Sequence, residues 1–176
     1  MFSFTRRSFS TTVSRFDRAV VYAVNGEPSN VLSVLTYPNI SPPQPNSVNI
    51  KFLLSPINPA DINVIEGVYP NKPTKTNALA PTGQGSERNP VFLAGNEGLA
   101  RVTAVGEGVH SFKLNDWVVM IKQQTGTWTT DKNVSVVDIA KIPGAGILSE
   151  AQAATLSVRL GVLTTQLSIA TPSCFR

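Results

Sequence analysis

Apolar and polar residues alternate most regularly along the segment SVNIKFLL, residues 47–54. Successive side chains of a β-strand point to opposite faces, so this alternation predicts a half-buried strand. Leu53 is the one apolar residue out of step with the pattern. The predicted apolar face consists of Val48, Ile50, Phe52 and Leu54, and the predicted polar face of Ser47, Asn49 and Lys51.

Shorter runs with β propensity are separated by turn residues along the rest of the chain. We expect further strands at residues 19–24, 31–37, 99–105 and 116–121. Two segments have the spacing or composition of short helices, PADINVIEG at 59–67 and SEAQAATLSV at 149–158. The pattern therefore predicts a mainly β fold, a barrel or a sandwich, with small helices.

Two connections between these elements have open interpretations. The glycines of AVGEGV, residues 104–109, are followed by Ser111 where a dinucleotide fingerprint requires a third glycine, so we predict a turn between strands and no phosphate loop. Residues 71–90 form a long segment with little apolar surface beyond ALA. Loops of this length are either disordered insertions or flaps over a site, and both alternatives stay open.

The positive charge of the chain is concentrated at its start. Arg6, Arg7 and Arg15 precede the first acidic residue, Asp17, and they account for three charges of the net +4. An Arg- and Ser-rich start without acids is typical of a mitochondrial presequence, which we predict for residues 1–17, with a disordered basic tail as the alternative. The remaining charge of about +1 lacks a basic patch with stacking aromatics and predicts no nucleic-acid binding. No apolar run reaches the roughly 18–20 residues of a membrane span.

Metal and disulfide chemistry are restricted by residue counts. The sequence has one cysteine, Cys174, and one histidine, His110. Neither a disulfide within the chain nor a closed Cys/His zinc site can form from these two residues. We predict no metal site.

Tyr69 lies in INPADINVIEGVYPNKP, residues 57–73, with polar turn-forming segments on both sides. Tyrosines in small domains usually pack through the ring, so its context alone leaves open whether the hydroxyl serves packing or chemistry. Asn58 precedes Pro59 at the start of a predicted helix, where it could act as a cap. Trp128 in GTW, residues 126–128, could be an ordinary core aromatic.

An ordered set of motifs carries a family resemblance. It consists of INPADINVIEGVYPNKP, LAGNEGLARVTAVGEGVHSFKLNDWVV, GTW and QAATLSV. Over about residues 18–158 the chain resembles the N-terminal GroES-like catalytic domain of medium-chain dehydrogenase/reductases, and within them the mitochondrial 2-enoyl thioester reductases. The resemblance implies a partly open GroES-like β-barrel. Zinc-dependent relatives carry histidine where this chain has Asn96 and a cysteine before the helix that contains Asp61, so the resemblance is to the zinc-free branch.

The resemblance also implies a function. Such enzymes reduce trans-2-enoyl thioesters of acyl carrier protein or coenzyme A with NADPH, in the fatty-acid synthesis of the mitochondrial matrix, as homodimers. Tyr69 of GVYP matches the catalytic tyrosine, whose hydroxyl can donate a hydrogen bond or a proton. The resemblance places Asn58 near the nicotinamide, as an alternative to its capping role. It makes Trp128 a candidate wall of the acyl pocket, as an alternative to a core position.

The resemblance ends after TLSV. The family has an asparagine where this chain has Arg159, and residues 159–176 are predicted to be a divergent tail. No Gly-rich strand–turn–helix segment capable of holding a pyrophosphate occurs, so we expect the nucleotide-binding Rossmann domain to be absent and this chain to be inactive alone. Two alternatives remain: a non-catalytic GroES-like module for acyl binding or subunit interaction, and a quinone oxidoreductase-like reductase.

Overall fold

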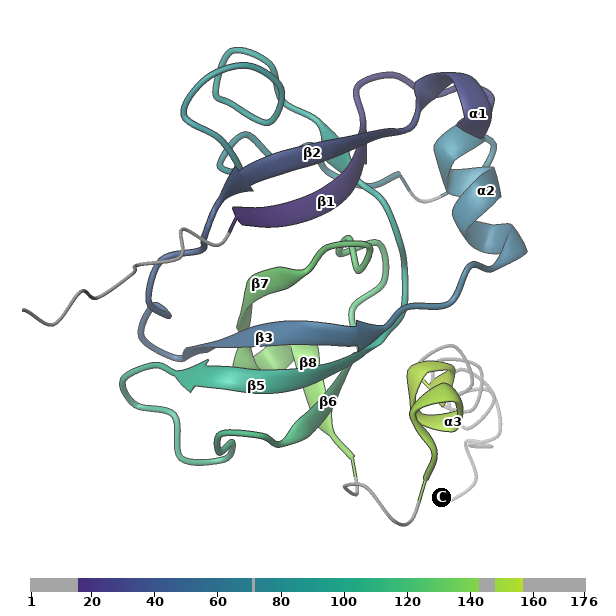
Figure 1. The fold of residues 1–176 in the computed structure, drawn as a ribbon. Helices are drawn as coiled ribbons and strands as arrows, with labels where there is room; N and C mark the ends of the chain where they lie inside the picture. The colour runs from purple at the N-terminus through teal and green to yellow at the C-terminus, as the bar shows by residue number, and fades with distance from the viewer. Residues whose placement is uncertain (1–15, 71, 143–147, 157–176) are drawn as a thin grey trace, which may run out of the picture.

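The computed structural model describes residues 16–70, 72–142 and 148–156, which form two antiparallel sheets (Figure 1). The first sheet has the strand order β2 (Ser33–Pro38), β1 (Phe16–Tyr22), β4 (Phe92–Leu93). The second has the order β7 (Asp131–Ser135), β3 (Ser47–Leu54), β5 (Leu99–Val105), β6 (Trp117–Met120), β8 (Ile139–Lys141). In these ranges all strand pairs are antiparallel, and none belongs to a Rossmann unit.

Residues 128–130 join the two sheets without closing them into a barrel. Ala19 of β1 forms an isolated bridge with Thr129, and Val20 N donates to the Trp128 carbonyl at 2.9 Å. Phe52 N of β3 donates to the carbonyl of Thr130 at 3.0 Å. A segment bonded to both sheets gives the partly open arrangement that the resemblance implied, so the predicted fold class is confirmed.

Strands β3 and β5 have the predicted bounds, and β6 is one residue shorter at each end. Strand β1 begins three residues before the predicted run, at Phe16, so two residues of the predicted presequence lie in the sheet. The start of the predicted strand 31–37 is wrong, because Pro28–Val31 forms the short helix α1. Proline at the first helical position favours this turn over a strand.

The prediction that β3 is polar and exposed on one face is wrong. Ser47 and Asn49 are buried. Their side chains are bonded by Asn133 of β7, whose Nδ2 donates to Ser47 Oγ and to Asn49 Oδ1, both at 2.9 Å. Asn49 Nδ2 donates to the Ser41 carbonyl at 2.9 Å. The polar face is therefore covered by partners that satisfy it, as burial requires.

Three of the four residues of the predicted apolar face of β3 belong to the main core, Val48 and Ile50 inside it and Phe52 packed against it, whereas Leu54 is 41% exposed and that part of the prediction is wrong. Val48 and Ile50 pack there with side chains of the other strands of the second sheet, namely Ala100, Val102, Val118, Met120, Val134 and Ile139. Leu53 belongs to the opposite face. It packs against the cluster around Leu99 and Val119, so this face is apolar at its end as well, which explains why Leu53 breaks the predicted alternation.

Three helical segments accompany the sheets besides α1. They are α2 (Pro59–Glu66), the 3-10 turn η1 (Val136–Asp138) and α3 (Glu150–Ala154). Both predicted helices therefore exist; α2 ends one residue before its motif does, and the last two residues of the second motif lie outside the described residues. Helix α3 is capped by Ser149, whose Oγ accepts from Gln152 N, and it packs Ala153 and Ala154 against Leu99 and Val119. Among the described residues, no helix has the length and apolar character to cross a membrane.

The turn at AVGEGV is confirmed. Gly108 has a φ of 78°, which favours glycine, and Asn46 N donates to the Glu107 carbonyl at 2.9 Å. Gly106 lies so close to the carbonyls of Gln44 and Ser47 that a Cβ would collide with backbone. These glycines therefore serve the turn after β5 and its packing against the start of β3.

Candidate active site

Helix α2 begins at Asn58. The backbone N–H of Asn58 donates to Asp61 Oδ2 at 2.8 Å, and the Asp61 N–H donates to the Asn58 carbonyl at 2.9 Å. Pro59 occupies the first helical turn, where its missing N–H costs nothing. Asn58 thus has the capping position that the sequence offered as one alternative.

The other end of α2 places Tyr69. Gly67 ends the helix in the left-handed conformation, with a φ of 82°, and both Val68 N and Tyr69 N donate to the Asn63 carbonyl. Asn25 Nδ2 donates to the carbonyl of Val64 at 3.1 Å and to that of Ile65 at 3.0 Å, which fixes the last turn from outside. The backbone of Tyr69 is therefore held by the helix end.

The side chain of Tyr69 is half-buried. Its hydroxyl makes no hydrogen bond to another residue in the described ranges, so a ligand can take it as a donor. Helix α2 has eight residues, so Asn58 and Tyr69 lie at opposite ends of a helix roughly 12 Å long.

The side chain of Asn58 contacts the GNEG segment. Asn58 Nδ2 donates to Glu97 Oε1 at 2.7 Å, and the Glu97 side chain is buried. Asp61 is buried in the same region. Burial raises the pKa of the Asp61 carboxyl, and the nearby charge of Glu97 adds to this rise, while the backbone N–H groups of Asn58 and Asn96 oppose it. Two buried carboxyl groups thus support the start of α2.

The GNEG and GTW segments are bonded together. Gly126 N and Thr127 N both donate to the Gly95 carbonyl, and Thr127 Oγ1 donates to the Glu97 carbonyl at 2.8 Å. Gly95 has a φ of 92°, and a Cβ on it would collide with the side chains of Trp128 and Thr127. Only glycine fits this contact.

Trp128 packs against the core and also borders an open hollow. Its Nε1 donates to the Pro56 carbonyl at 3.2 Å, two residues before Asn58, and its ring packs on the core cluster of Tyr22, Ile65 and Ala94. The ring also lines an apolar hollow of about 660 Å³. The other apolar side chains of this hollow are Ala19, Val20, Leu32, Val34, Phe52, Leu53, Leu54 and Ile57.

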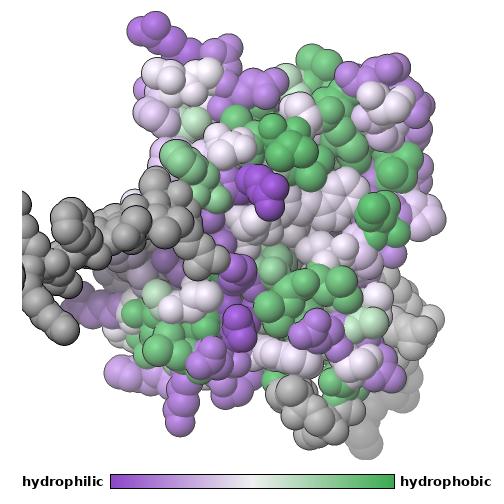
Figure 2. Space-filling model, viewed as in Figure 1, coloured by the Kyte–Doolittle hydropathy of each residue, from purple (hydrophilic) through white to green (hydrophobic). Residues whose placement is uncertain are grey.

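This hollow lies between β1–β2 and the end of β3. Figure 2 shows apolar side chains gathered over both sheets on the face seen in Figure 1. Val34 and Ile57 at the hollow are 68% and 72% exposed, so the apolar surface is open to a ligand.

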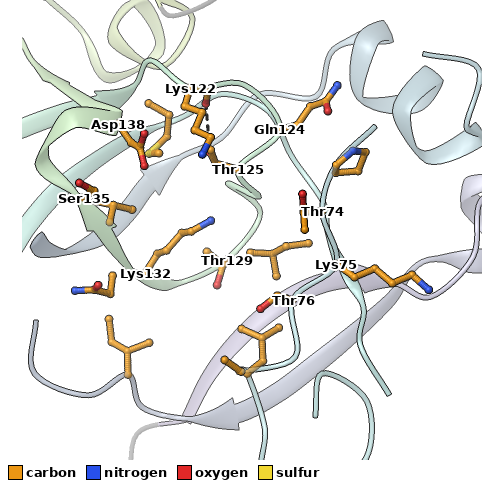
Figure 3. Close-up of a pocket in the computed structure, with 18 of the residues that line it drawn as sticks. Thr74, Lys75, Thr76, Lys122, Gln124, Thr125, Thr129, Lys132, Ser135 and Asp138 are labelled. Atoms are coloured by element: carbon orange, nitrogen blue, oxygen red, sulfur yellow. Dashed lines mark hydrogen bonds between the residues drawn. The ribbon is translucent and has the colours of Figure 1, made fainter. Parts of the chain in front are cut away.

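A second, more polar cavity of about 700 Å³ lies against β7 (Figure 3). One wall is formed by residues 72–79, the start of the long loop that follows Tyr69. This loop is held by a bridge between Thr76 and Val91 and by Leu79 N donating to the Gly85 carbonyl at 3.0 Å. The described part of the loop therefore walls a cavity. The side chain of Lys132 enters the cavity from β7 (Figure 3).

In the part of the chain that the structure describes, no three His, Cys, Asp or Glu side chains are grouped to hold a metal ion. His110 is exposed in the connection after β5, far in sequence from GNEG, and Cys174 lies outside the described residues. At the position where zinc-dependent relatives have histidine, Asn96 Oδ1 accepts a hydrogen bond of 2.6 Å from Gln124 N. The Asn96 side chain therefore holds the backbone of the loop at Gln124.

The structure brings together two of the three residues singled out from the sequence, Asn58 and Trp128. Trp128 is bonded to Pro56, two residues before Asn58, and Asn58 is bonded to Glu97 of GNEG. Tyr69 stands apart at the far end of α2. Sequence reasoning missed Glu97 as the partner of Asn58, and it missed Lys132. The signal for Glu97 was a charged residue in the run GNEGLA, residues 95–100, whose other members are uncharged. Lys132 lies between Asp131 and Asn133, a polar stretch that gave no signal.

Two linked antiparallel sheets and a helix whose ends carry Asn58 and Tyr69 define a GroES-like domain. The chain belongs to the alcohol dehydrogenase GroES-like domain family, whose family model matches residues 44–160.

The chain is also similar to individual proteins of known activity. It is 38% identical over 155 residues to the mitochondrial enoyl-[acyl-carrier-protein] reductase of Schizosaccharomyces pombe, covering 87% of this chain and 40% of that protein. A solved Etr1p complex with NADP and crotonyl-CoA has a TM-score of 0.77 and 35% identity, covering 90% of this chain and 44% of that one. The Etr1p/Etr2p heterodimer of the mitochondrial 2-enoyl thioester reductase from Candida tropicalis has a TM-score of 0.75, 35% identity and the same coverage.

The chain thus spans less than half the length of these relatives. The last of them is a heterodimer, whereas the resemblance had implied homodimers.

Proposed function

We propose that this chain is the thioester-binding, catalytic-domain part of an NADPH-dependent 2-enoyl thioester reductase of the mitochondrion. The observation that carries the proposal is the TM-score of 0.77 to a reductase in complex with NADP and crotonyl-CoA, over 90% of this chain. The mitochondrial location rests on the names of the relatives and on the Arg- and Ser-rich start of the sequence, residues 1–15 of which lie outside the described residues.

The described residues fit one end of NADPH. Asn58 presents a side-chain amide at the start of α2, where it can bond the nicotinamide carboxamide or a ribose hydroxyl. A Gly-rich strand–turn–helix that would bind the pyrophosphate is not found in the described ranges. NADPH, when bound, supplies the hydride for the β-carbon of the enoyl group. Residues 159–176, proposed as a divergent tail, lie outside the described residues.

The Tyr69 hydroxyl supplies a hydrogen-bond donor for the thioester oxygen and a proton donor for the α-carbon. Hydride addition at the β-carbon moves negative charge onto the α-carbon and the thioester oxygen. A tyrosine hydroxyl can donate a hydrogen bond to that oxygen or a proton to the α-carbon. The half-buried position after α2 holds the hydroxyl on a fixed backbone without a competing partner among the described residues.

The apolar hollow beside Trp128 is the proposed place of the acyl chain. Its volume of about 660 Å³ is in the range of small-molecule sites, and its lining is aliphatic and aromatic. Burying the chain there gains about 0.8 kcal/mol per methylene group. Either acyl carrier protein or coenzyme A can present such a chain.

The test is a calorimetric titration of the full chain with crotonyl-CoA, in parallel with a record of NADPH absorbance. We expect crotonyl-CoA to bind, and Tyr69→Phe to weaken binding about tenfold through loss of one hydrogen bond. Tyr22→Phe is the matched control, since the buried Tyr22 hydroxyl has no hydrogen-bond partner among the described residues. Absence of crotonyl-CoA binding, or equal binding by Tyr69→Phe, contradicts the proposal.

The same titration separates the two alternatives. A non-catalytic acyl-binding module would depend on the hollow at Trp128 and tolerate Tyr69→Phe. A quinone oxidoreductase-like reductase would bind a quinone in preference to crotonyl-CoA. We expect NADPH oxidation by this chain to be slow or absent, because the described residues bind only the nicotinamide end.

A further inference from the structure

The polar cavity of Figure 3 contains a lysine that the proposed reduction does not use. Lys132 is half-buried, and its Nζ lies 3.4 Å from the Gly126 carbonyl, at the outer limit of a hydrogen bond. The cavity of about 700 Å³ around it is open to solvent and large enough for a small ligand. The amine is thus poorly bonded and reachable.

Two charged side chains on the cavity wall shift the pKa of Lys132 in opposite directions. Burial lowers the pKa of Lys132 to about 8; Asp138 partly opposes this, and the like charge of Lys122 adds to it. Asp138 and Lys122 both line the cavity, one from η1 and one from the loop after β6 (Figure 3). At pH 8, about half of the Lys132 side chains are therefore neutral amines, against well under 1% for an unperturbed lysine.

We propose that Lys132 is a site of covalent acylation, at which its amine takes the acyl group of an acyl thioester bound in the cavity. The amine nitrogen attacks the thioester carbonyl carbon, an N–C bond forms and the C–S bond breaks. The thiolate leaves and the proton lost from nitrogen ends on the thiol, so the products are an amide and a free thiol. The choice of acyl thioester as donor rests on the proposed function.

The surroundings of Lys132 suit each part of this transfer. The hydroxyls of Thr74 and Thr76 and the ammonium group of Lys122 line the same cavity and can stabilise negative charge on the carbonyl oxygen. The Asp138 carboxylate can accept the proton that the nitrogen loses. Leu79 and Leu93 add apolar surface for a short acyl chain.

The experiment incubates the full chain with butyryl-CoA and locates acyl-lysine by peptide mass spectrometry. Butyryl-CoA is saturated and cannot be reduced, so failure of the reductase proposal does not affect the result. At pH 8 we expect Lys132 to be acylated on the order of tenfold faster than the surface residue Lys141; the larger neutral fraction is partly offset by lower nucleophilicity. Lys132→Arg should abolish this acylation and Lys141→Arg should not.

The pH profile gives a readout that needs no Lys132 variant. The rate at Lys132 should level off above pH about 8, and Lys122→Gln should move the midpoint to higher pH by removing a like charge. Acylation spread over lysines by exposure, or a Lys132 rate that keeps rising to pH 10 like that of an ordinary amine, overturns the proposal.

Discussion

The side-chain amide of Asn58 donates a 2.7 Å hydrogen bond to Oε1 of Glu97, 39 positions along the chain. This bond ties the start of α2 to the GNEG segment, and Glu97 is in turn held through its carbonyl by Thr127 Oγ1. The candidate nicotinamide contact is therefore positioned by a buried carboxylate and not by the helix alone.

Glu97→Ala should lower the free energy of unfolding by about 1–3 kcal/mol, because the Asn58 amide loses a charged partner in a buried place. Urea denaturation measures the change. Glu87→Ala, in an exposed part of the long loop, is the matched control and should change stability by less than about 0.5 kcal/mol. Equal effects of the two substitutions would contradict the role given to Glu97.

Asp61→Asn should be better tolerated at neutral pH than Asp61→Ala. The folded-state pKa of Asp61 is raised, so the stability it contributes is greatest below its unfolded pKa and is lost as pH rises through the folded value. Asparagine keeps an acceptor for the Asn58 N–H and removes the charge beside Glu97. Alanine removes the cap and should cost about 0.5–2 kcal/mol.

Unfolding measured at pH 4 and pH 7 checks this prediction. Wild type should lose stability relative to Asp61→Asn between the two values. If the difference between the two proteins does not change with pH, the ionisation of Asp61 is not being opposed by its surroundings.

Gly95→Ala should be strongly destabilising, by about 2–4 kcal/mol, since the new Cβ meets Trp128 and Thr127 and the φ of 92° is strained for alanine. Gly83→Ala is a matched control with a similar φ of 75° and nothing within 4 Å of the new Cβ. It isolates the backbone cost, roughly 1 kcal/mol. Thermal unfolding of both variants should separate the two terms, and a comparable cost would show that the Thr127 side chain and both the side chain and backbone of Trp128 shift freely.

Local patterns were enough to predict the strands whose alternation is strong. Strands β3 and β5 have their predicted bounds, and the shift at Leu53 coincides with the register irregularity between Phe52 and Leu54. Strands β4, β7 and β8 were not predicted. They are short, and β7 contains Asp131, Lys132 and Asn133, residues of low β propensity that pair with β3 only because the chain returns there.

The site was predictable only where one motif contains both position and chemistry. Asn58 and Tyr69 are fixed by caps that can be seen in the sequence, a proline after one and a glycine before the other. Glu97 depends on a contact with Asn58, 39 positions away, and the position of Lys132 depends on the pairing of β7 with β3. Burial of Ser47 and Asn49 has the same origin, because Asn133 arrives from another strand.

Lys132→Met should raise the free energy of unfolding at pH 7, by up to about 3 kcal/mol, because the protonated amine is unfavourably buried in the folded chain. The folded pKa of about 8 lies below the unfolded 10.5, so the unfolded state binds more protons between these values and wild-type stability rises with pH across this window. The advantage of Lys132→Met should therefore shrink steadily from pH 8 to pH 10.5.

Urea denaturation at pH 7, 9 and 10.5 measures this loss of advantage. Lys141→Met is the control, since Lys141 is 49% exposed and its 2.8 Å ion pair with Asp116 is worth at most about 1 kcal/mol. That substitution should lower stability slightly. A Lys132→Met protein that is less stable than wild type at pH 7 would mean that the amine is well compensated in the cavity, and it would remove the electrostatic ground for a reactive Lys132 as well.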